Sequence, residues 1–421
     1  MNAPTLAART WCALGLTAAL LVHGHASAQV APPRDERNAS FWNRIDNPPP
    51  DPMQPPRSWY KPLATVRATP GPFLPQAEAG KTRIAPQVLE QASQFAQANG
   101  AQSLIVIHQG VVQLERYYDG TDAGTPFSSH SLVKTLAALL LGAAIADGHI
   151  ASLDEPASKW LGEWRDSQRD RITLRQLLQM SGGFNTPLNS DPAQRFMQMH
   201  YGSDVEAIVR SAPLAYPPGQ GWAFDNDNLH PIGLVIERAT GMPYQDYLAR
   251  RLWQGLGAAQ AQLLMDREGG RAYMYCCMLS LPRDWARLGQ MLLDGGVWQG
   301  RRLLPAAFVE ELRKPAAANP DFGLQLMLGA AWLNPKINRF LERQRATLPA
   351  RAPAGLVYLS GAGGQQVAIL PAEQLVIVRT GKFAPGWRDA TLPVMLHEAL
   401  AQPADAASAP QAAPMAGAGR P

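Results

Sequence analysis

The stretch from Phe127 to Gly148 begins with a group of serines and is then apolar on nearly every face of a helix. A serine before such a run and a glycine after it are typical of the two ends of a helix. A helix that is apolar all round is a buried helix. The pattern therefore predicts a central buried helix, around which the rest of the chain is organised.

Elsewhere the hydrophobic pattern predicts strands near both ends of the chain and helices in its middle. A helix at 84–99 comes before two strands, 103–108 and 111–118, that are joined by a glycine turn. Further helices are expected at 172–180, 232–241, 244–256, 282–293, 305–312 and 390–401, and late strands at 323–333, 357–361, 366–370 and 374–379. Early and late strands can join one antiparallel sheet. We therefore predict an α+β fold in which helices flank this sheet, a helical block forms a second lobe, and the active site lies in the cleft between them.

The two ends of the chain are expected to lie outside the main domain. Residues 1–28 look like a secretory signal peptide, with an apolar run that ends at Ala26-Ser27-Ala28. An uncleaved N-terminal anchor is the alternative, but the run is short for a bilayer. The predicted order is a signal peptide at 1–28, a proline-rich extended arm at 29–80, the main domain at 81–402 and a disordered tail at 403–421. After cleavage we expect a periplasmic or secreted protein without stable membrane insertion.

Composition argues against several classes of function. The formal charge is only +4 over 421 residues, which does not suggest a nucleic-acid partner. The eight histidines show no ligand spacing, so we predict no metal and no other cofactor. Cys276 and Cys277 are adjacent, and adjacent cysteines rarely bridge each other. We expect two buried, unbridged thiols, and the sequence leaves the oligomeric state open.

Lys134 is the unusual residue of the buried helix. A buried ammonium must find partners or lose its proton, and Ser131 lies one turn before Lys134 on the same helix face. A desolvated lysine amine can accept the hydroxyl proton of such a serine, which makes the serine a nucleophile. The alternative is a helix cap followed by a lysine that reaches the surface. Ser58 and Lys61 repeat the S-x-x-K pattern, but no apolar helix follows them.

From about residue 100 to 400, the order and spacing of several motifs resemble the serine β-lactamase and penicillin-binding-protein superfamily. The closest branch is that of class C-like esterases and nylon-oligomer hydrolases. The motifs are Glu115-Arg-Tyr-Tyr-Asp-Gly120, Ser131-Leu-Val-Lys134, residues 172–183, Pro218-Gly219 with Trp222, residues 283–289 and residues 295–300. The resemblance implies that Ser131 is the acylated nucleophile and Lys134 its proton acceptor.

The third motif of that superfamily falls on Leu359-Ser360-Gly361-Ala362, followed by Gly-Gly-Gln. The resemblance implies a strand that lines the site, and an oxyanion hole formed by the backbone N–H groups of Ser131 and Ala362. Leu359 replaces the basic residue of the family, which weakens the expectation of carboxylate recognition. Arg379-Thr-Gly381 has similar letters but ends the next strand, so we interpret it as a decoy.

The second motif, a Tyr-x-Asn in the family, reads Phe224-Asp225-Asn226. Phenylalanine cannot transfer a proton. Delivery of a proton to the leaving group must then fall to Lys134 or to a neighbouring side chain; the auxiliary candidates are Asp225, Asp227, His230, Tyr201 and Tyr216. We predict a serine hydrolase that acts on small-molecule esters or amides. The alternatives are a catalytically weak relative that binds peptide or cell-wall fragments, and a penicillin-binding peptidase.

Overall fold

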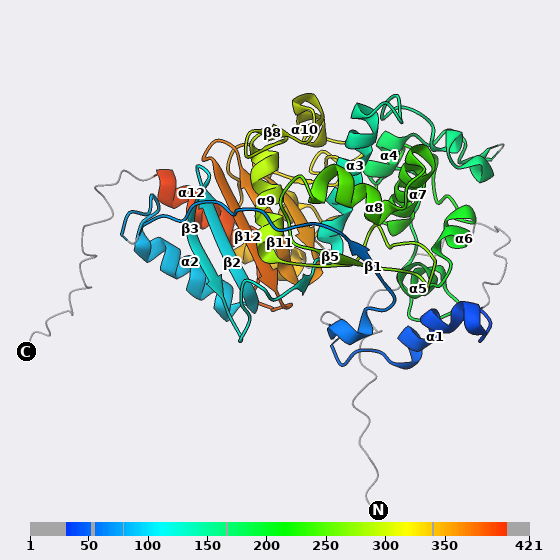
Figure 1. Ribbon diagram of the computed structural model, residues 1–421, viewed down its shortest axis with the longest axis horizontal. Coiled ribbons are helices and arrows are strands. Elements are labelled where there is room, and N and C mark those ends of the chain that lie inside the picture. Colours follow the sequence, from blue (N-terminus) through cyan, green and yellow to red (C-terminus); the bar gives the residue numbers. More distant parts are fainter. Residues whose placement is uncertain (1–30, 52–54, 79, 166, 339–340, 402–421) are drawn as a thin grey trace, which may run out of the picture.

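The computed structural model describes residues 31–51, 55–78, 80–165, 167–338 and 341–401. The expected signal peptide and C-terminal tail lie outside the described residues. Figure 1 shows a lobe built on a β-sheet beside a lobe of helices. Among the described residues, no helix has both the length and the apolar character needed to cross a membrane.

The main sheet has six strands in the order β3-β2-β12-β11-β10-β9. The strands are β2 (Ala101–His108), β3 (Val111–Tyr117), β9 (Met327–Leu328), β10 (Val357–Gly361), β11 (Gln365–Leu370) and β12 (Leu375–Gly381). Every neighbouring pair is antiparallel, so the early and late strands do join one sheet. The expected strand at 323–333 is wrong over most of its length, because Gln325 and Gly329 have a left-handed backbone that a strand cannot contain.

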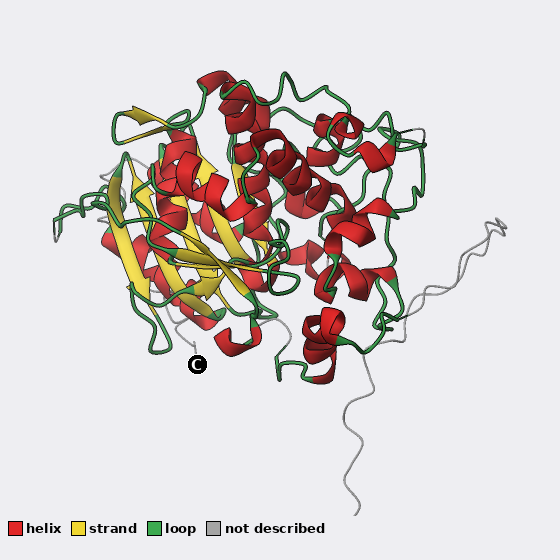
Figure 2. Ribbon diagram, turned by 45° about the vertical axis from the view of Figure 1, so that its right-hand side comes forward, coloured by secondary structure: helices red, strands yellow, loops and turns green. Residues whose placement is uncertain are grey.

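Helices cover both faces of this sheet (Figure 2). Helices α2 (Pro86–Ala98) and α12 (Thr391–Ala401) pack on one face, and α9 (Pro282–Leu293) packs on the other (Figure 1). Gly289 lets α9 approach closely, since a Cβ at this position would lie 2.7 Å from the Cγ1 atom of Val376 in β12. All three helices were expected from the sequence, because each has a hydrophobic face with helical spacing.

The helical lobe surrounds α3 (Val133–Ala146), which packs against α7 and α8. Its other helices are α4 (Leu174–Leu178), α5 (Arg195–Tyr201), α6 (Val205–Arg210), α7 (Leu229–Thr240), α8 (Tyr244–Leu248) and α10 (Ala306–Leu312); a small hairpin of β7 (Val297–Trp298) and β8 (Arg301–Arg302) lies beside α10. The short helix α11 (Leu341–Gln344) lies between β9 and β10 in the chain. Every residue of α3 from Val133 to Ala144 is buried. The predicted central helix is therefore confirmed.

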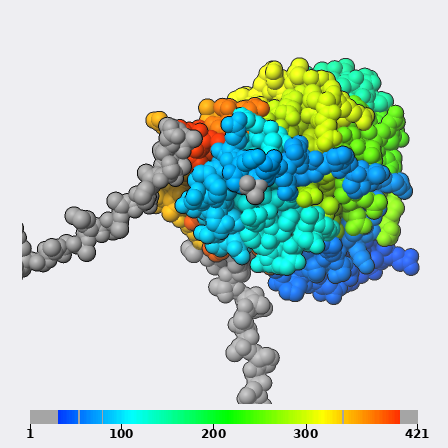
Figure 3. All heavy atoms as spheres, turned by 60° about the vertical axis from the view of Figure 1, so that its left-hand side comes forward, coloured from blue at the N-terminus to red at the C-terminus, as the bar shows by residue number. Residues whose placement is uncertain are grey.

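The segment expected as an extended arm is only partly extended. It contains helix α1 (Ala39–Asp46) and strand β1 (Leu63–Val66). Strand β1 opens a second sheet that the sequence did not predict, of order β1-β5-β6-β4, with β5 (Ala261–Leu264), β6 (Met278–Ser280) and β4 (Phe127–Ser128). Arg44 anchors α1, because its buried guanidinium donates to the carbonyls of Tyr201 at 3.0 Å and Lys61 at 2.9 Å. In Figure 3 the blue band of this segment crosses one face of the molecule.

Gly142 in the middle of α3 is expected to tolerate no side chain. A Cβ there would lie 2.2 Å from the ring of Phe308 in α10, which is itself buried. Because the whole ring must move, Gly142→Ala should lower the free energy of unfolding by about 1–2 kcal/mol, although alanine favours the helix. Denaturant unfolding measures this, with Gly162→Ala as control. No atom lies within 4 Å of a Cβ at Gly162, so an equal loss in both variants would contradict the packing described.

Candidate active site

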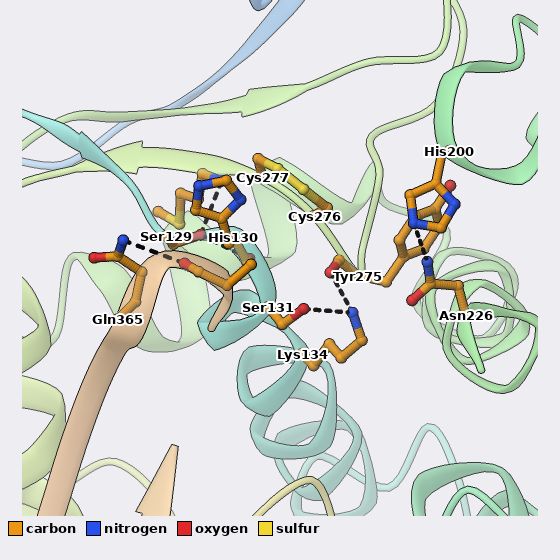
Figure 4. The surroundings of a disulfide bond; sticks show 12 residues. Ser129, His130, Ser131, Lys134, His200, Asn226, Tyr275, Cys276, Cys277 and Gln365 are labelled. Atoms are coloured by element: carbon orange, nitrogen blue, oxygen red, sulfur yellow. Dashed lines mark hydrogen bonds between the residues drawn. A yellow bond between two sulfur atoms is a disulfide. The ribbon is translucent and has the colours of Figure 1, made fainter. Parts of the chain in front are cut away.

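The nucleophile candidate and its lysine lie at the start of the central helix. Ser131 belongs to the short 3-10 turn His130–Leu132, and Lys134 is the second residue of α3, which continues from that turn. The Nζ atom of Lys134 lies 3.1 Å from the Oγ atom of Ser131 (Figure 4). Nζ also donates to the backbone carbonyl of Tyr275 at 2.6 Å. The structure thus brings the predicted pair into direct contact.

The surroundings of Lys134 disfavour its charge. The side chain is only 4% exposed, and the rings of Phe224 and Tyr275 have centroids 5.4 and 5.6 Å from Nζ. Burial lowers the pKa of Lys134 to about 7, and the nearby Asp225 carboxyl opposes this shift. A neutral amine can donate one N–H to Tyr275 and accept the Ser131 hydroxyl proton with its lone pair. An amine with a pKa near neutrality is suited to act as a general base.

The rate of Ser131 acylation is expected to depend on the protonation of Lys134. Since the neutral amine is the base, kcat/KM for an ester should rise as the pH increases through about 7 and then level off. Asp225→Asn should move this rise to lower pH, because the carboxyl that raises the lysine pKa is removed. A pH series of initial rates for both proteins is the measurement. A profile that is flat on both sides of neutrality would exclude Lys134 as the base.

The third-motif strand lies against the turn that carries the nucleophile. A Cβ at Gly361, the last residue of β10, would lie 2.7 Å from the carbonyl oxygen of Ser129 and 3.2 Å from the amide nitrogen of Leu132. Only glycine permits this approach. Leu359 lies two residues earlier and so on the same face of the strand, and it is buried. An apolar side chain thus stands where the family places a basic one.

The chain turns sharply after Gly361, and this turn positions Ala362. Gly363 and Gly364 have φ values of +78° and +74°, which suit glycine. Gln365 donates from Nε2 to the carbonyl of Ala362 at 3.3 Å and thereby braces the turn. Ser360 is half-buried and pairs across β10 and β11 with Gln366. The oxyanion role of the Ser131 and Ala362 amides stays a prediction, supported by the short distance between the two segments.

The second-motif residues lie beside Lys134. Phe224 turns its ring toward Nζ, and the Asp225 carboxyl accepts from the amide of Asp227 at 2.9 Å. Burial raises the pKa of Asp225 to about 6, and the Asp227 carboxylate adds to this shift. Asp227 itself accepts from Arg195 at 2.8 Å, in an ion pair that is buried. Asp225 therefore tunes the lysine, whereas Asp227 is held in a structural pair.

Three of the auxiliary candidates do not contact the catalytic pair through hydrogen bonds in the described structure. The Tyr216 hydroxyl donates to the carbonyl of Phe184 at 3.1 Å, and the Tyr201 ring packs against Trp59 with centroids 5.8 Å apart. In the described structure neither hydroxyl has a hydrogen bond to the Ser131 and Lys134 pair. His230 is fully buried with no hydrogen-bond partner for its ring, and burial lowers its pKa to about 3. In the described structure none of the three has a hydrogen bond to Ser131 or Lys134.

His200 is a site residue that the sequence reasoning did not select. Its Nδ1 atom lies 3.0 Å from the carbonyl oxygen of Phe196, so Nδ1 carries the proton. Its Nε2 atom can then accept from the Nδ2 group of Asn226 at 3.4 Å. Figure 4 shows the Asn226 side chain between His200 and Lys134. Tyrosines were the expected proton carriers in residues 184–221, but a histidine can also carry a proton, and His200 lies in the same segment.

The cysteine prediction is wrong. Cys276 and Cys277 form a disulfide with each other, rather than two separate buried thiols. Cys277 is buried, Cys276 is half-buried, and the disulfide lies beside the His130 ring (Figure 4). The rarity of adjacent bridges was a weak guide here, because the chain holds this segment against the turn at 129–131. The amide of Ser129 donates to the carbonyl of Met278 at 2.8 Å.

The two segments that resemble catalytic motifs in sequence alone, Ser58 to Lys61 and Arg379 to Gly381, lie outside the site. Ser58 and Lys61 are both exposed on the arm, and the short 3-10 turn that contains Ser58 does not continue into a buried helix. Arg379 is fully buried in β12 and donates to the carbonyls of Asn99 at 2.7 Å and Lys382 at 2.9 Å. It joins the end of β12 to the end of α2. Burial and structural context therefore distinguish the site at Ser131 from these two segments of similar sequence.

With this geometry established, comparison with known proteins identifies the family. A family model described as Beta-lactamase matches residues 85–393. The chain belongs to the beta-lactamase family. Its fold is also that of a Bacillus anthracis protein provisionally classed as a 6-aminohexanoate-dimer hydrolase, with a TM-score of 0.67, 18% identity, and coverage of 87% of this chain and 96% of that one.

Two curated relatives are more similar in sequence. The 6-aminohexanoate-dimer hydrolase of Paenarthrobacter ureafaciens is 26% identical over 58% of this chain. Esterase EstB of Burkholderia gladioli is 29% identical over 40% of it. The matches span 64% and 48% of the lengths of these two proteins. Membership of the family and the α+β fold, both expected from the motifs, are confirmed.

Proposed function

We propose that this protein is a serine hydrolase that forms an acyl-enzyme on Ser131 and acts better on esters than on amides. The observation that carries the proposal is the contact of 3.1 Å between Ser131 Oγ and a buried Lys134 amine whose pKa is about 7. A cap followed by a surface lysine would leave this amine exposed and charged. Among related proteins, one is named an esterase and another a hydrolase of the 6-aminohexanoate dimer.

The proposed acylation moves one proton and exchanges one bond. Ser131 Oγ attacks the carbonyl carbon while its proton passes to the Lys134 amine. Negative charge develops on the carbonyl oxygen, which the Ser131 and Ala362 amides would stabilise. The carbonyl re-forms as the bond to the leaving group breaks, and the lysine proton goes to that group. Water then repeats these steps on the acyl-enzyme, with Lys134 as base, and releases the acid and the serine.

The preference for esters follows from Phe224. The ring lies 5.4 Å from Nζ, but it has no hydroxyl with which to pass a proton onward. An alcohol leaves readily without full protonation, whereas an amine does not. Lys134 alone must then protonate the leaving group, so the hydrolysis rates of amides and β-lactams should be reduced more than those of esters. Buried Leu359 offers no charge to a substrate carboxylate, which further argues against penicillins as substrates.

We also propose that the mature enzyme works in the periplasm or outside the cell. This part of the proposal is supported by the N-terminal sequence, in which an apolar run precedes Ala26-Ser27-Ala28. Mapping of the N-terminal peptide from the exported protein tests it. Recovery of Met1 in that protein would refute cleavage.

The proposed activity is tested with matched substrates that share an acyl group. Purified protein is given short-chain p-nitrophenyl esters, the corresponding p-nitroanilides and a chromogenic β-lactam. We expect ester hydrolysis that Ser131→Ala abolishes, and amide and lactam rates that are lower by about 10²-fold or more. Absence of hydrolysis for every substrate, together with thermal stabilisation by a cell-wall fragment, would favour the binding-protein alternative.

A further inference from the structure

The segment that contains the two cysteines contacts residues on both sides of Ser131. Before the cysteines, the carbonyl of Tyr275 accepts from Lys134 at 2.6 Å. After them, the amide of Met278 donates to the Ser129 hydroxyl at 3.0 Å. The disulfide therefore lies in a segment that helps to position both members of the catalytic pair. A chemical change at the sulfurs would therefore alter the position of the catalytic pair.

His130 completes a group of soft donor atoms in this segment. A ring nitrogen of His130 and the two sulfur atoms all lie within 4.8 Å of one another. Figure 4 shows the ring beside the disulfide, on the side of the turn that leads to Ser131. His130 has a φ of +44°, a conformation that costs a non-glycine residue about 1–3 kcal/mol unless its surroundings hold it. The position of this ring is thus set by the fold around it.

We propose that reduction of the Cys276–Cys277 disulfide creates a three-donor site for a thiophilic metal ion, with His130 as the third ligand, and that an ion bound there inhibits the hydrolase. Thiolate and imidazole are the donors that Zn²⁺ and Cu⁺ prefer. Donor atoms around one zinc ion lie roughly 3.5 Å apart, given Zn–S bonds of about 2.3 Å. To reach this spacing, the two sulfurs must move apart once their bond is reduced, and the imidazole, within 4.8 Å of them, must move slightly closer.

The chemistry balances with an external dithiol as the reductant. The dithiol supplies two electrons and two protons, the S–S bond breaks to give two thiols, and the reductant becomes its own disulfide. Metal binding then displaces the two thiol protons. Cys276 is half-buried, so an external reagent can reach the bond from that side. Three protein ligands leave the fourth position of a zinc ion open to water.

Inhibition follows from the movement of these three donors when they bind one ion. Ser131 is the next residue after His130, and the carbonyl that holds Lys134 belongs to the residue before Cys276. Drawing the three donors onto one ion shifts both backbone segments. A displacement of about 1 Å in a catalytic pair can cost 10²-fold in rate. This inhibitory part rests on the proposed hydrolase function, whereas metal binding does not.

Zinc titration tests the site without any substrate. The full-length mature protein is reduced with a phosphine, desalted without oxygen and titrated with Zn²⁺ against a chromogenic chelator. Reduced wild type should bind one equivalent, and the oxidised protein should bind none at this site. Cys276→Ser, Cys277→Ser and His130→Gln should each weaken binding at least tenfold, whereas His149→Gln, at an exposed histidine, should not. Thermal unfolding checks that each variant is folded.

Three results would overturn the proposal: no binding by reduced wild type, equal binding by oxidised and reduced protein, or unchanged binding in folded His130→Gln. Ester hydrolysis is followed in the same titration and should fall in step with occupancy. Full activity at full occupancy would refute the inhibition. If no preparation hydrolyses an ester, the proposed function fails, while the zinc titration still decides whether the site exists.

Discussion

Replacement of Lys134 by arginine is expected to lower kcat/KM for a p-nitrophenyl ester by about 10³-fold. Arginine keeps its proton throughout the accessible pH range, so it cannot accept the proton of Ser131. The wild-type amine can do so because burial lowers its pKa to about 7. Lys134→Met removes the base with less change in volume and should cost a similar factor. Steady-state rates of both variants give the measurement.

The control for these variants is Lys159→Arg. Lys159 is half exposed and pairs with Glu155 at 2.7 Å, so arginine can replace it without loss of activity. Denaturant unfolding of each variant separates loss of the base from loss of the fold. Activity within a few fold of wild type in folded Lys134→Met would show that some other group deprotonates the serine.

Introduction of the absent phenol should raise amide turnover. Because the Phe224 ring already lies 5.4 Å from Nζ of Lys134, Phe224→Tyr adds a hydroxyl next to the base without a new ring to accommodate. A positioned general acid contributes about 10²–10⁴-fold. We expect the rate of anilide hydrolysis to rise by about 10²-fold, the lower end of this range, and the rate of ester hydrolysis by only a few fold, since alcohols need less protonation. Initial rates on the matched ester and anilide pair measure the difference.

Phe95→Tyr in α2 is the matched control, because Phe95 packs against Trp387 at the far side of the sheet. It should change neither rate. Equal gains for ester and anilide in Phe224→Tyr would show that the phenol acts on binding or stability and not on the leaving group. No gain on either substrate would mean that Lys134 already completes proton transfer by itself.

Much of the fold could be predicted because its elements carry local patterns. Helices α2, α3 and α9 have clear ends and hydrophobic faces, and the strands β2, β3, β11 and β12 are rich in apolar and β-branched residues. The second sheet could not be predicted, since strands of two to four residues such as β4 and β6 hold too few positions for a period to show. The burial of Arg44 could not be predicted either, because its guanidinium donates to backbone carbonyls from distant parts of the chain.

The site divides in the same way. Ser131 and Lys134 were predictable because a lysine in a buried helix is costly, and Phe224 because it breaks a family motif. His200 was not, since its role depends on a partner distant in sequence, and the Cys276–Cys277 bridge was not, since adjacent cysteines rarely bridge each other. His200 is linked to the site by its hydrogen bond with Asn226, and the two cysteine sulfurs lie close to the ring of His130. Such contacts are set by tertiary packing and leave no spacing in the sequence.

The most direct test of the central claim is intact-mass spectrometry after treatment with a fluorophosphonate probe, followed by peptide mapping. We expect a single adduct on Ser131 of the wild type, because Lys134 at 3.1 Å activates that hydroxyl. Ser131→Ala should remain unlabelled, and Ser58→Ala should label like wild type. A folded wild-type protein that gains no adduct, or an adduct that maps to Ser58 or another serine, would contradict the assignment of Ser131 as the nucleophile.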